Sequence, residues 1–146
     1  KIPRLASYNQ ILTGTYQGRE WLTNGACFID KNYASKAAIK TEPLTEYQVS
    51  NMDYIVQDFD KIIGSRSKII GFKREKEIEY YQEYERIYLM MNTGEQIKIS
   101  GDNYSWFADT GMIEGYALYG ADKFSPIYLL NIIKKEVVGC VMPLRN

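Results

Sequence analysis

The most regular hydrophobic pattern in the chain lies between Ser50 and Gly64. Apolar residues recur there at the i, i+3, i+4, i+7 spacing of an amphipathic helix, and they are Met52, Ile55, Val56, Phe59, Ile62 and Ile63. Ser50 and Asp53 resemble a capping box at the start, with Asp in place of Glu. Gly64 stands where a left-handed C-cap is expected. We therefore predict a helix that packs its apolar face on a sheet.

Two other stretches are interrupted by turn residues. Between Arg19 and Asp30, aromatic and aliphatic residues flank Asn24-Gly25, a dipeptide that favours a type I′ hairpin turn. Further along, Arg86–Met91 and Gln96–Ser100 flank a four-residue connection that contains Gly94. Each stretch therefore predicts a strand, a turn and a second strand.

The segment Glu77–Glu85 follows Lys68–Phe72, itself a predicted strand. A continuous strand would place Ile78, Tyr80, Gln82 and Tyr84 on one side and Glu77, Glu79, Glu83 and Glu85 on the other. A helix is also compatible with this segment, and it would stack Tyr80, Tyr84 and Tyr88 on one face. Both interpretations stay open, and the alternation favours the strand.

The remaining pattern is less regular. It predicts a short helix over Pro3–Leu12, a loop over Lys31–Tyr47 and, after a cap at Asp102, a short helix that ends before Gly111. The last part of the chain predicts strands near Glu114–Tyr119, Pro126–Asn131 and Glu136–Val141. Together these elements predict one α+β domain over residues 1–146, mostly antiparallel sheet with helices packed on a face.

Composition narrows the class of function. The chain has 146 residues, 45% of them hydrophobic, which is enough for one packed core. Its 18 basic and 18 acidic residues cancel, so autonomous binding to DNA is not expected. It contains no histidine, which excludes Ser/His and Cys/His nucleophile pairs and His-ligated zinc from this sequence. No apolar run approaches about 20 residues, so we expect no membrane span and a cytoplasmic protein.

The residues that most resemble reactive groups have structural explanations. Asp58 and Asp60 are two apart on a predicted helix, so they project in different directions and do not share a cation. The glutamates of Glu77–Glu85 fit a solvated face that nearby lysines and arginines neutralise. Cys27 and Cys140 lie in apolar runs, which favours buried free thiols, although one disulfide between them stays open. We therefore expect a binding protein without metal or cofactor, and no enzyme.

A motif order near the C-terminus carries a family resemblance. Phe124-Ser125-Pro126-Ile127 is followed by a further strand and then by Val138-Gly139-Cys140-Val141-Met142-Pro143-Leu144-Arg145. This ending resembles the bacterial DNA polymerase III β sliding clamp, in which a Ser-Pro-hydrophobic strand leads into a final strand and a Met-Pro-hydrophobic-Arg tail. Trp21–Phe28 is similar to the strand that enters the family's Thr-Asp-Gly-His-Arg-Leu turn. Tyr104–Met112 stands where clamp domains carry their second helix.

The resemblance implies a peptide-binding surface. In the family, the tail and the turn line a hydrophobic pocket for short peptides of replication proteins. The matching residues here are Val141, Met142, Pro143 and Leu144 in the tail, and Thr23, Gly25 and Phe28 at the turn. Ala26 and Cys27 replace the family's His and Arg, which removes the polar part of that pocket. A clamp chain strings three such domains together, so a ring of single domains would be a homo-oligomer of about six copies.

A second hypothesis is an anti-defence module, encoded by a phage or mobile element, that sequesters a nucleotide-like small molecule. Tyr104, Trp106 and Phe107 would stack a base, and Lys98 or Lys123 would contact phosphate. The same viral or mobile-element origin is expected for the peptide-binding protein. A carboxylate-dependent enzyme ranks third. A core role for the aromatic residues and a simple edge strand for the tail are the structural alternatives.

Overall fold

The computed structural model describes residues 11–33, 41–43, 58–105 and 115–144. In chain order its strands are β1 (Ile11–Tyr16), β2 (Arg19–Thr23), β3 (Cys27–Asp30), β4 (Thr41–Pro43), β5 (Ser67–Glu79), β6 (Gln82–Met91), β7 (Gln96–Ser100), β8 (Tyr116–Gly120), β9 (Ile127–Asn131) and β10 (Glu136–Val141). The helices are α3 (Phe59–Ser65) and α4 (Gly101–Tyr104), and a single 3-10 turn spans Lys31–Tyr33.

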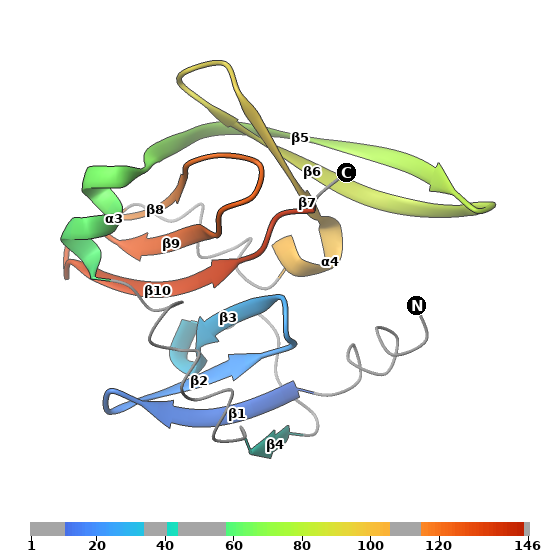
Figure 1. Cartoon of the computed structure of the whole chain (residues 1–146). Helices are drawn as coiled ribbons and strands as arrows, with labels where there is room; N and C mark the ends of the chain where they lie inside the picture. Colours follow the sequence, from blue (N-terminus) through green and yellow to red (C-terminus); the bar gives the residue numbers. More distant parts are fainter. Residues whose placement is uncertain (1–10, 34–40, 44–57, 106–114, 145–146) are drawn as a thin grey trace.

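The strands form one sheet in the order β4-β1-β2-β3-β10-β9-β8-β5-β6-β7. Three groups of strands that are neighbours in sequence, β1 to β3, β5 to β7 and β8 to β10, are each joined by antiparallel pairing. Only the pair of β1 with β4, among the described strands, is parallel. The fold is therefore mostly antiparallel sheet with two helices, as the α+β prediction requires (Figure 1).

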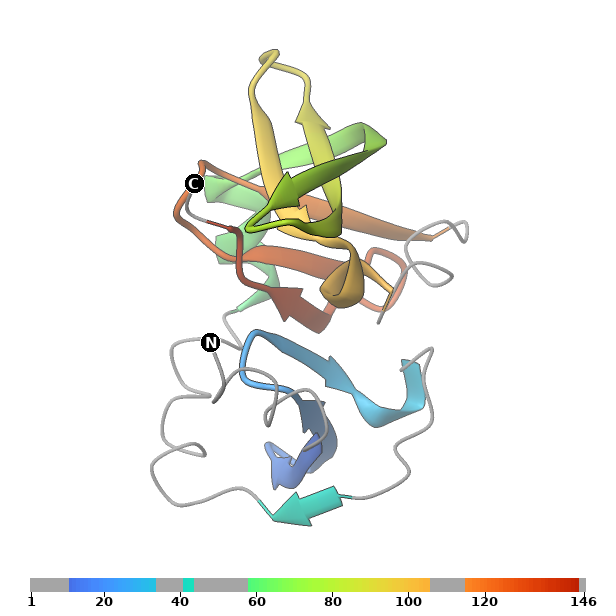
Figure 2. The same ribbon diagram turned by 90° about the vertical axis from the view of Figure 1, so that its right-hand side faces the viewer.

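The sheet bends so that β5, β6 and β7 lie above β8, β9 and β10 (Figures 1 and 2). The main core fills the space between these layers, with Ile87, Leu89, Ile97 and Ile99 on one side and Ile127, Leu129 and Val138 on the other. Gly120, at the end of β8, lies close against β7, because a Cβ atom there would meet Ile97 Cδ1 at 2.7 Å. Glycine at the end of β8 therefore permits the bend.

The opposite face of β9 and β10 carries a second core beneath α3. Ile62 of the helix is fully buried there with Tyr128, Leu130 and Cys140. Arg66 follows the helix and places its guanidinium 4.7 Å from the centre of the Tyr128 ring. The predicted packing of this helix on a sheet is confirmed.

The helix boundaries and caps differ from the prediction. The described helix begins at Phe59 with Asp58 as its N-cap, and the predicted cap residues Ser50 and Asp53 lie outside the described residues. Gly64 lies inside α3, whose C-cap is Arg66 in an extended conformation. For α4 the cap is Ser100, whose hydroxyl accepts from the Asn103 amide at 3.0 Å, and not Asp102. In α4, therefore, the Ser100 hydroxyl and not the Asp102 carboxylate caps the first free amides.

The predicted strands are largely confirmed, with three corrections. The stretch predicted as a loop over Lys31–Tyr47 contains β4, which adds to the sheet edge beside β1. Ile11 and Leu12, predicted as the end of a helix, belong to β1, while Pro3 to Gln10 lie outside the described residues. The turn after β2 has a positive φ at Gly25 only, the pattern of a type II′ turn and not of type I′.

Glu77–Glu85 is extended, as predicted, but it is a hairpin and not one strand. The chain turns at Tyr80 and Tyr81, both with positive φ. Glu79 then pairs with Gln82 and Glu77 with Tyr84, so these four residues share one face. Ile78 instead pairs with Glu83. The predicted separation of faces is wrong beyond the turn, because reversing the chain changes which residues lie together.

The two cysteines are buried free thiols, which confirms the favoured prediction over the disulfide. They lie on neighbouring strands in opposite cores: Cys27 belongs to the core between the layers and Cys140 to the core beneath α3. Burial raises the pKa of both thiols, that of Cys140 to about 12. Neither sulfur is therefore activated as a thiolate at neutral pH.

Candidate functional sites

The turn after β2 is built by its own side chains. Asn24 Oδ1 accepts hydrogen bonds from the amides of Ala26 and Cys27 at 2.9 and 2.8 Å. Its side-chain nitrogen donates to Asn103 Oδ1 of α4 at 3.0 Å. Thr23 Oγ1 accepts from the Gly25 amide at 2.9 Å. These bonds fix the conformation of the turn and attach it to α4.

Residues 142–144 continue β10 along this turn. Val141 pairs with Cys27, and the Met142 amide then donates to the Ala26 carbonyl at 2.8 Å. The Leu144 amide donates to the Lys98 carbonyl of β7, also at 2.8 Å. This last bond joins the segment after β10 to the far edge of the bent sheet. We call Gly25, Ala26, Met142, Pro143 and Leu144 the turn-and-tail surface.

The predicted peptide-binding residues do not all reach this surface. Met142, Pro143 and Leu144 are partly exposed, and Gly25 is exposed. Val141 and Thr23 are buried, and Phe28 packs against the core beneath α3, on the other face of the sheet. Cys27, which replaces an arginine in the family's turn, is fully buried. The side chains brought together at the surface are therefore apolar and few.

The predicted ligand-binding residues are placed apart. Tyr104 is buried in the main core, with its ring 5.4 Å from that of Phe72. Lys98 lies on the outer face of β7, where its ammonium is 3.5 Å from Glu77. Lys123 is exposed in the connection between β8 and β9, and Trp106 and Phe107 lie outside the described residues. Tyr104 and Lys98 thus lie on opposite faces of the sheet.

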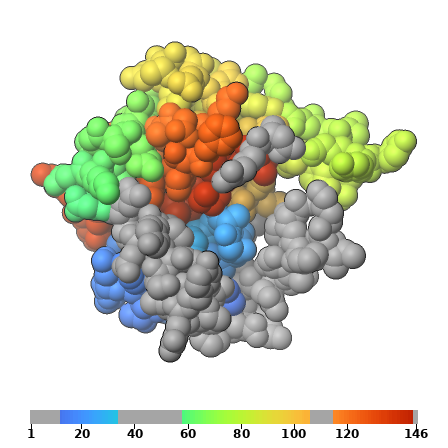
Figure 3. Space-filling model, viewed as in Figure 1, coloured from blue at the N-terminus to red at the C-terminus, as the bar shows by residue number. Residues whose placement is uncertain are grey.

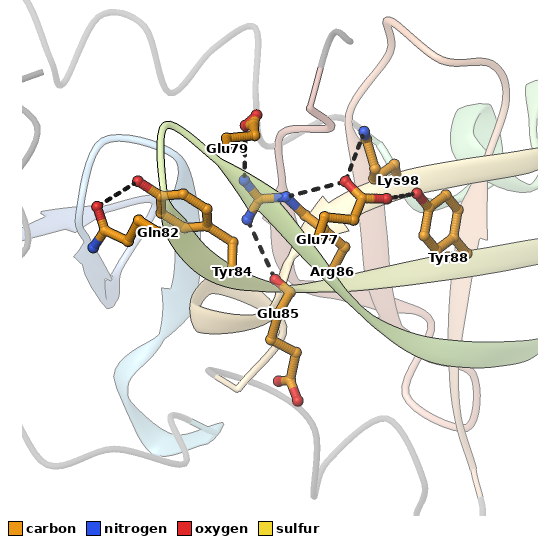
Figure 4. Close-up of polar contacts among 8 residues, drawn as sticks. All are labelled: Glu77, Glu79, Gln82, Tyr84, Glu85, Arg86, Tyr88 and Lys98. Carbon is orange, nitrogen blue, oxygen red and sulfur yellow. Dashed lines mark hydrogen bonds and ion pairs between the residues drawn. The ribbon is translucent and has the colours of Figure 1, made fainter.

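The outer face of β5, β6 and β7 carries a polar cluster in which cations neutralise glutamates, as the sequence predicted for Glu77–Glu85 (Figure 4). Glu77 is at its centre and contacts Lys98 at 3.5 Å, Arg86 at 4.0 Å and the hydroxyl of Tyr88. Arg86 also lies 3.7 Å from Glu79 and donates to the Glu85 carbonyl at 3.3 Å. The strand register explains the cluster, because the alternate residues of the three strands share this face.

The cluster alters two pKa values. The Tyr88 hydroxyl donates to Glu77, and this bond, together with burial, raises the pKa of Tyr88 to about 12. The same bond and the ammonium of Lys98 lower the pKa of Glu77, against the effect of its burial. Glu77 is therefore ionised and Tyr88 protonated at neutral pH. The carboxylate accepts the hydrogen bond that the tyrosine hydroxyl donates. Such an arrangement stabilises the sheet and leaves no poised acid or base.

Beyond the pair of Glu75 with Arg86, the hairpin of β5 and β6 has neither β7 nor β8 beside it. We call this two-stranded part, residues 76–85, the arm. It projects from the body of the protein (Figures 1 and 3). Its tip consists of Tyr80 and Tyr81, both almost completely exposed. Sequence reasoning missed the tip because neither residue is typical of a tight turn.

Among the described residues, no group of three metal-ligating side chains lies close enough to hold an ion. In the same part of the chain, no helix is long and apolar enough to cross a membrane. No family model, no curated protein and no solved structure matches the chain.

Proposed function

We propose that this protein is a non-enzymatic binding protein that recognises a hydrophobic segment of a protein partner at the turn-and-tail surface. The observation that carries the proposal is the 2.8 Å hydrogen bond from the Met142 amide to the Ala26 carbonyl. It holds three partly exposed residues, Met142 to Leu144, beside an exposed tight turn. A partner that covers them gains roughly 25 cal/mol for each Å² of apolar surface removed from water.

The rigidity of this surface favours binding. The amides of Met142 and Leu144 are already bonded to Ala26 and Lys98, and the turn is bonded to α4 through Asn24. A partner therefore does not have to order the backbone when it binds, which lowers the entropic cost of association. Methionine adds a flexible and polarisable side chain that adapts to different apolar partners.

The resemblance to sliding clamps supports the same surface, because that family binds peptides with a Met-Pro tail beside a turn. Our proposal is accordingly a clamp-like domain with a reduced pocket. Alanine at position 26 and the buried Cys27 offer no cationic side chain, so recognition here rests on apolar contacts. A partner segment rich in leucine, phenylalanine or methionine fits this chemistry.

Selection from a library of random displayed peptides tests the proposal. We expect the enriched peptides to be apolar and their affinity to fall about tenfold or more when Met142→Ser and Leu144→Ser are combined. Ile133→Ser, on an exposed residue of the turn between β9 and β10, is the matched control and should bind normally. Unchanged peptide binding by the double variant, with its cooperative unfolding transition retained, would contradict the proposal.

A further inference from the structure

The tip of the arm combines an unfavourable backbone with fully exposed aromatic side chains. Tyr80 has a φ of 51° and Tyr81 a φ of 63°, so both occupy the left-handed region. Glycine and asparagine adopt that region easily, whereas a bulky side chain there is strained. A two-residue turn with both φ values positive is a type I′ turn, for which Asn-Gly is the favoured sequence.

The tyrosine side chains make no contact that would stabilise the described part of the fold. Tyr80 is 89% exposed and Tyr81 104% exposed, and Ile78 beside them is 74% exposed. Neither tyrosine makes a hydrogen bond or ring contact among the described residues. An apolar group at the end of a projecting hairpin, strained and uncovered, has the properties of a contact element and not of a structural one.

The charges around the tip define what it can contact. The arm contains Glu77, Glu79, Glu83 and Glu85 against one cation, Lys76. Glu85 is paired with Arg74 at 3.2 Å, and Glu77 with residues at the base of the arm. Glu79 lies 3.7 Å from Arg86 at the base of the arm, and Glu83 lies 3.8 Å from the exposed Lys76. The surface next to the tyrosines is therefore acidic, which disfavours anionic membranes and nucleic acids.

We propose that the tip of the arm is a second interaction surface, which inserts Tyr80 and Tyr81 into an apolar pocket of a folded protein partner whose rim carries lysine or arginine. The tyrosines supply large, rigid contact area at the centre, and Glu79 and Glu83 meet the basic rim. This surface is separate from the turn-and-tail surface in sequence and in composition. It therefore stands or fails independently of the proposed function.

Replacing both tyrosines with Asn-Gly, the sequence that favours this turn, distinguishes a role in folding from a role in binding. Tyr80→Asn combined with Tyr81→Gly removes both rings and relieves the strain. If the tyrosines bind the partner and do not stabilise the fold, we expect the thermal unfolding midpoint of this double variant to rise by about 2–6 °C. A fall in the midpoint would show that the tyrosines stabilise the fold and would overturn the proposal.

The partner is found with a photo-crosslinking residue, p-benzoylphenylalanine, in place of Tyr81 in the cells that produce the protein. The matched control carries the same residue in place of Phe124, an exposed aromatic residue in the connection between β8 and β9. We expect a protein adduct at position 81 that is absent at position 124, with the crosslinked segment apolar and flanked by lysine or arginine. Equal labelling at both positions, or no adduct, overturns the proposal.

Binding of the purified partner then supplies the quantitative test. We expect about a tenfold or larger loss of affinity for the Tyr80→Asn, Tyr81→Gly protein and about a threefold loss for Glu83→Lys. Met142→Ser with Leu144→Ser, and Phe124→Ser, should leave this affinity unchanged. An affinity indifferent to the tip variants overturns the proposal. So does tip-dependent binding to phosphatidylserine vesicles or single-stranded DNA in place of the protein.

Discussion

At the scale of single residues, Tyr88 and Glu77 show how the register of strands creates a pH-sensitive contact. The bond between them raises the pKa of Tyr88 from 10.0 to about 12 and lowers that of Glu77 from 4.5. The contribution of Tyr88 to stability is complete below pH 10 and is lost as the pH rises towards 12. That of Glu77 is present above pH 4.5 and is lost as the pH falls through the lowered pKa.

Tyr88→Phe should therefore lower the free energy of unfolding by about 1 kcal/mol at neutral pH. Because the native protein loses the same contact when Tyr88 ionises, the difference from the variant should shrink between pH 10 and 12. Urea denaturation at a series of pH values measures this. Tyr84→Phe is the control, because the Tyr84 hydroxyl donates to the neutral Gln82 at 3.0 Å. A difference that stays constant up to pH 12 would contradict the assignment.

At the scale of elements, the arm differs from the strands to which it is attached. Ile87 and Leu89 of β6 are buried and lie between β5 and β7, whereas residues 76–85 pair only with each other. An isolated two-stranded ribbon is marginally stable in water. Its hydrogen bonds therefore open more easily than those of the same strands inside the sheet.

Amide hydrogen exchange should resolve this difference along a single strand. We expect the arm amides to exchange at least about a hundredfold faster than those of residues 87–91, which open only with the core. Nuclear magnetic resonance or mass spectrometry at low protein concentration measures the rates. Equal protection in both segments would mean that the arm is covered in solution, contrary to the exposure of its tip.

Prediction from the sequence succeeded where local chemistry determined structure. The alternation of Gln96–Ser100 and the glycine in the turn before it gave β7 and its hairpin correctly, and the apolar runs gave β9 and β10. It failed at the arm, because Tyr80-Tyr81 carries no turn signal and the strained turn is imposed by pairing of the flanking strands. The cap of α4 was predicted wrongly because the helix begins at Gly101, so that Asp102 lies inside it and Ser100 takes the cap position.

The functional surfaces were less predictable than the strands. That residues 142–144 lie beside the turn depends on the pairing of β10 with β3, which no local pattern encodes. The family resemblance had placed the same residues together, but it had also included Phe28, which the alternation of β3 directs to the other face. Neutralisation of the glutamates by nearby cations was predicted, but the contacts of Tyr88 and Lys98 with Glu77 were not, since the three residues come from three strands.

At the scale of the whole molecule, the segment after β10 joins the interior strands β3 and β10 to the edge strand β7. Leu144 bonds to Lys98 in β7, while Met142 bonds to Ala26 beside β3. The contact at Leu144 therefore links the chain that follows β10 to β7, whose Ile97 and Ile99 belong to the main core. It also satisfies a carbonyl of an edge strand that is otherwise open to pairing.

A chain that ends at Pro143 should be less stable than one that ends at Leu144 by about 1–2 kcal/mol. The loss combines one hydrogen bond with part of a leucine side chain. Urea denaturation of the two truncated proteins measures the difference, and the protein that ends at Leu144 is the control for removal of the final residues. Equal midpoints would show that the Leu144 contact does not stabilise the fold.

The order of the strands also has a kinetic consequence. Each of the three antiparallel groups forms from neighbouring segments, but joining them requires β3 to meet β10 and β5 to meet β8 across long stretches of chain. Closing such long loops lowers the entropy of the chain before the new contacts can stabilise it. We therefore expect these two junctions to form last. The main core, which draws residues from all three groups, is therefore assembled in the slow step of folding.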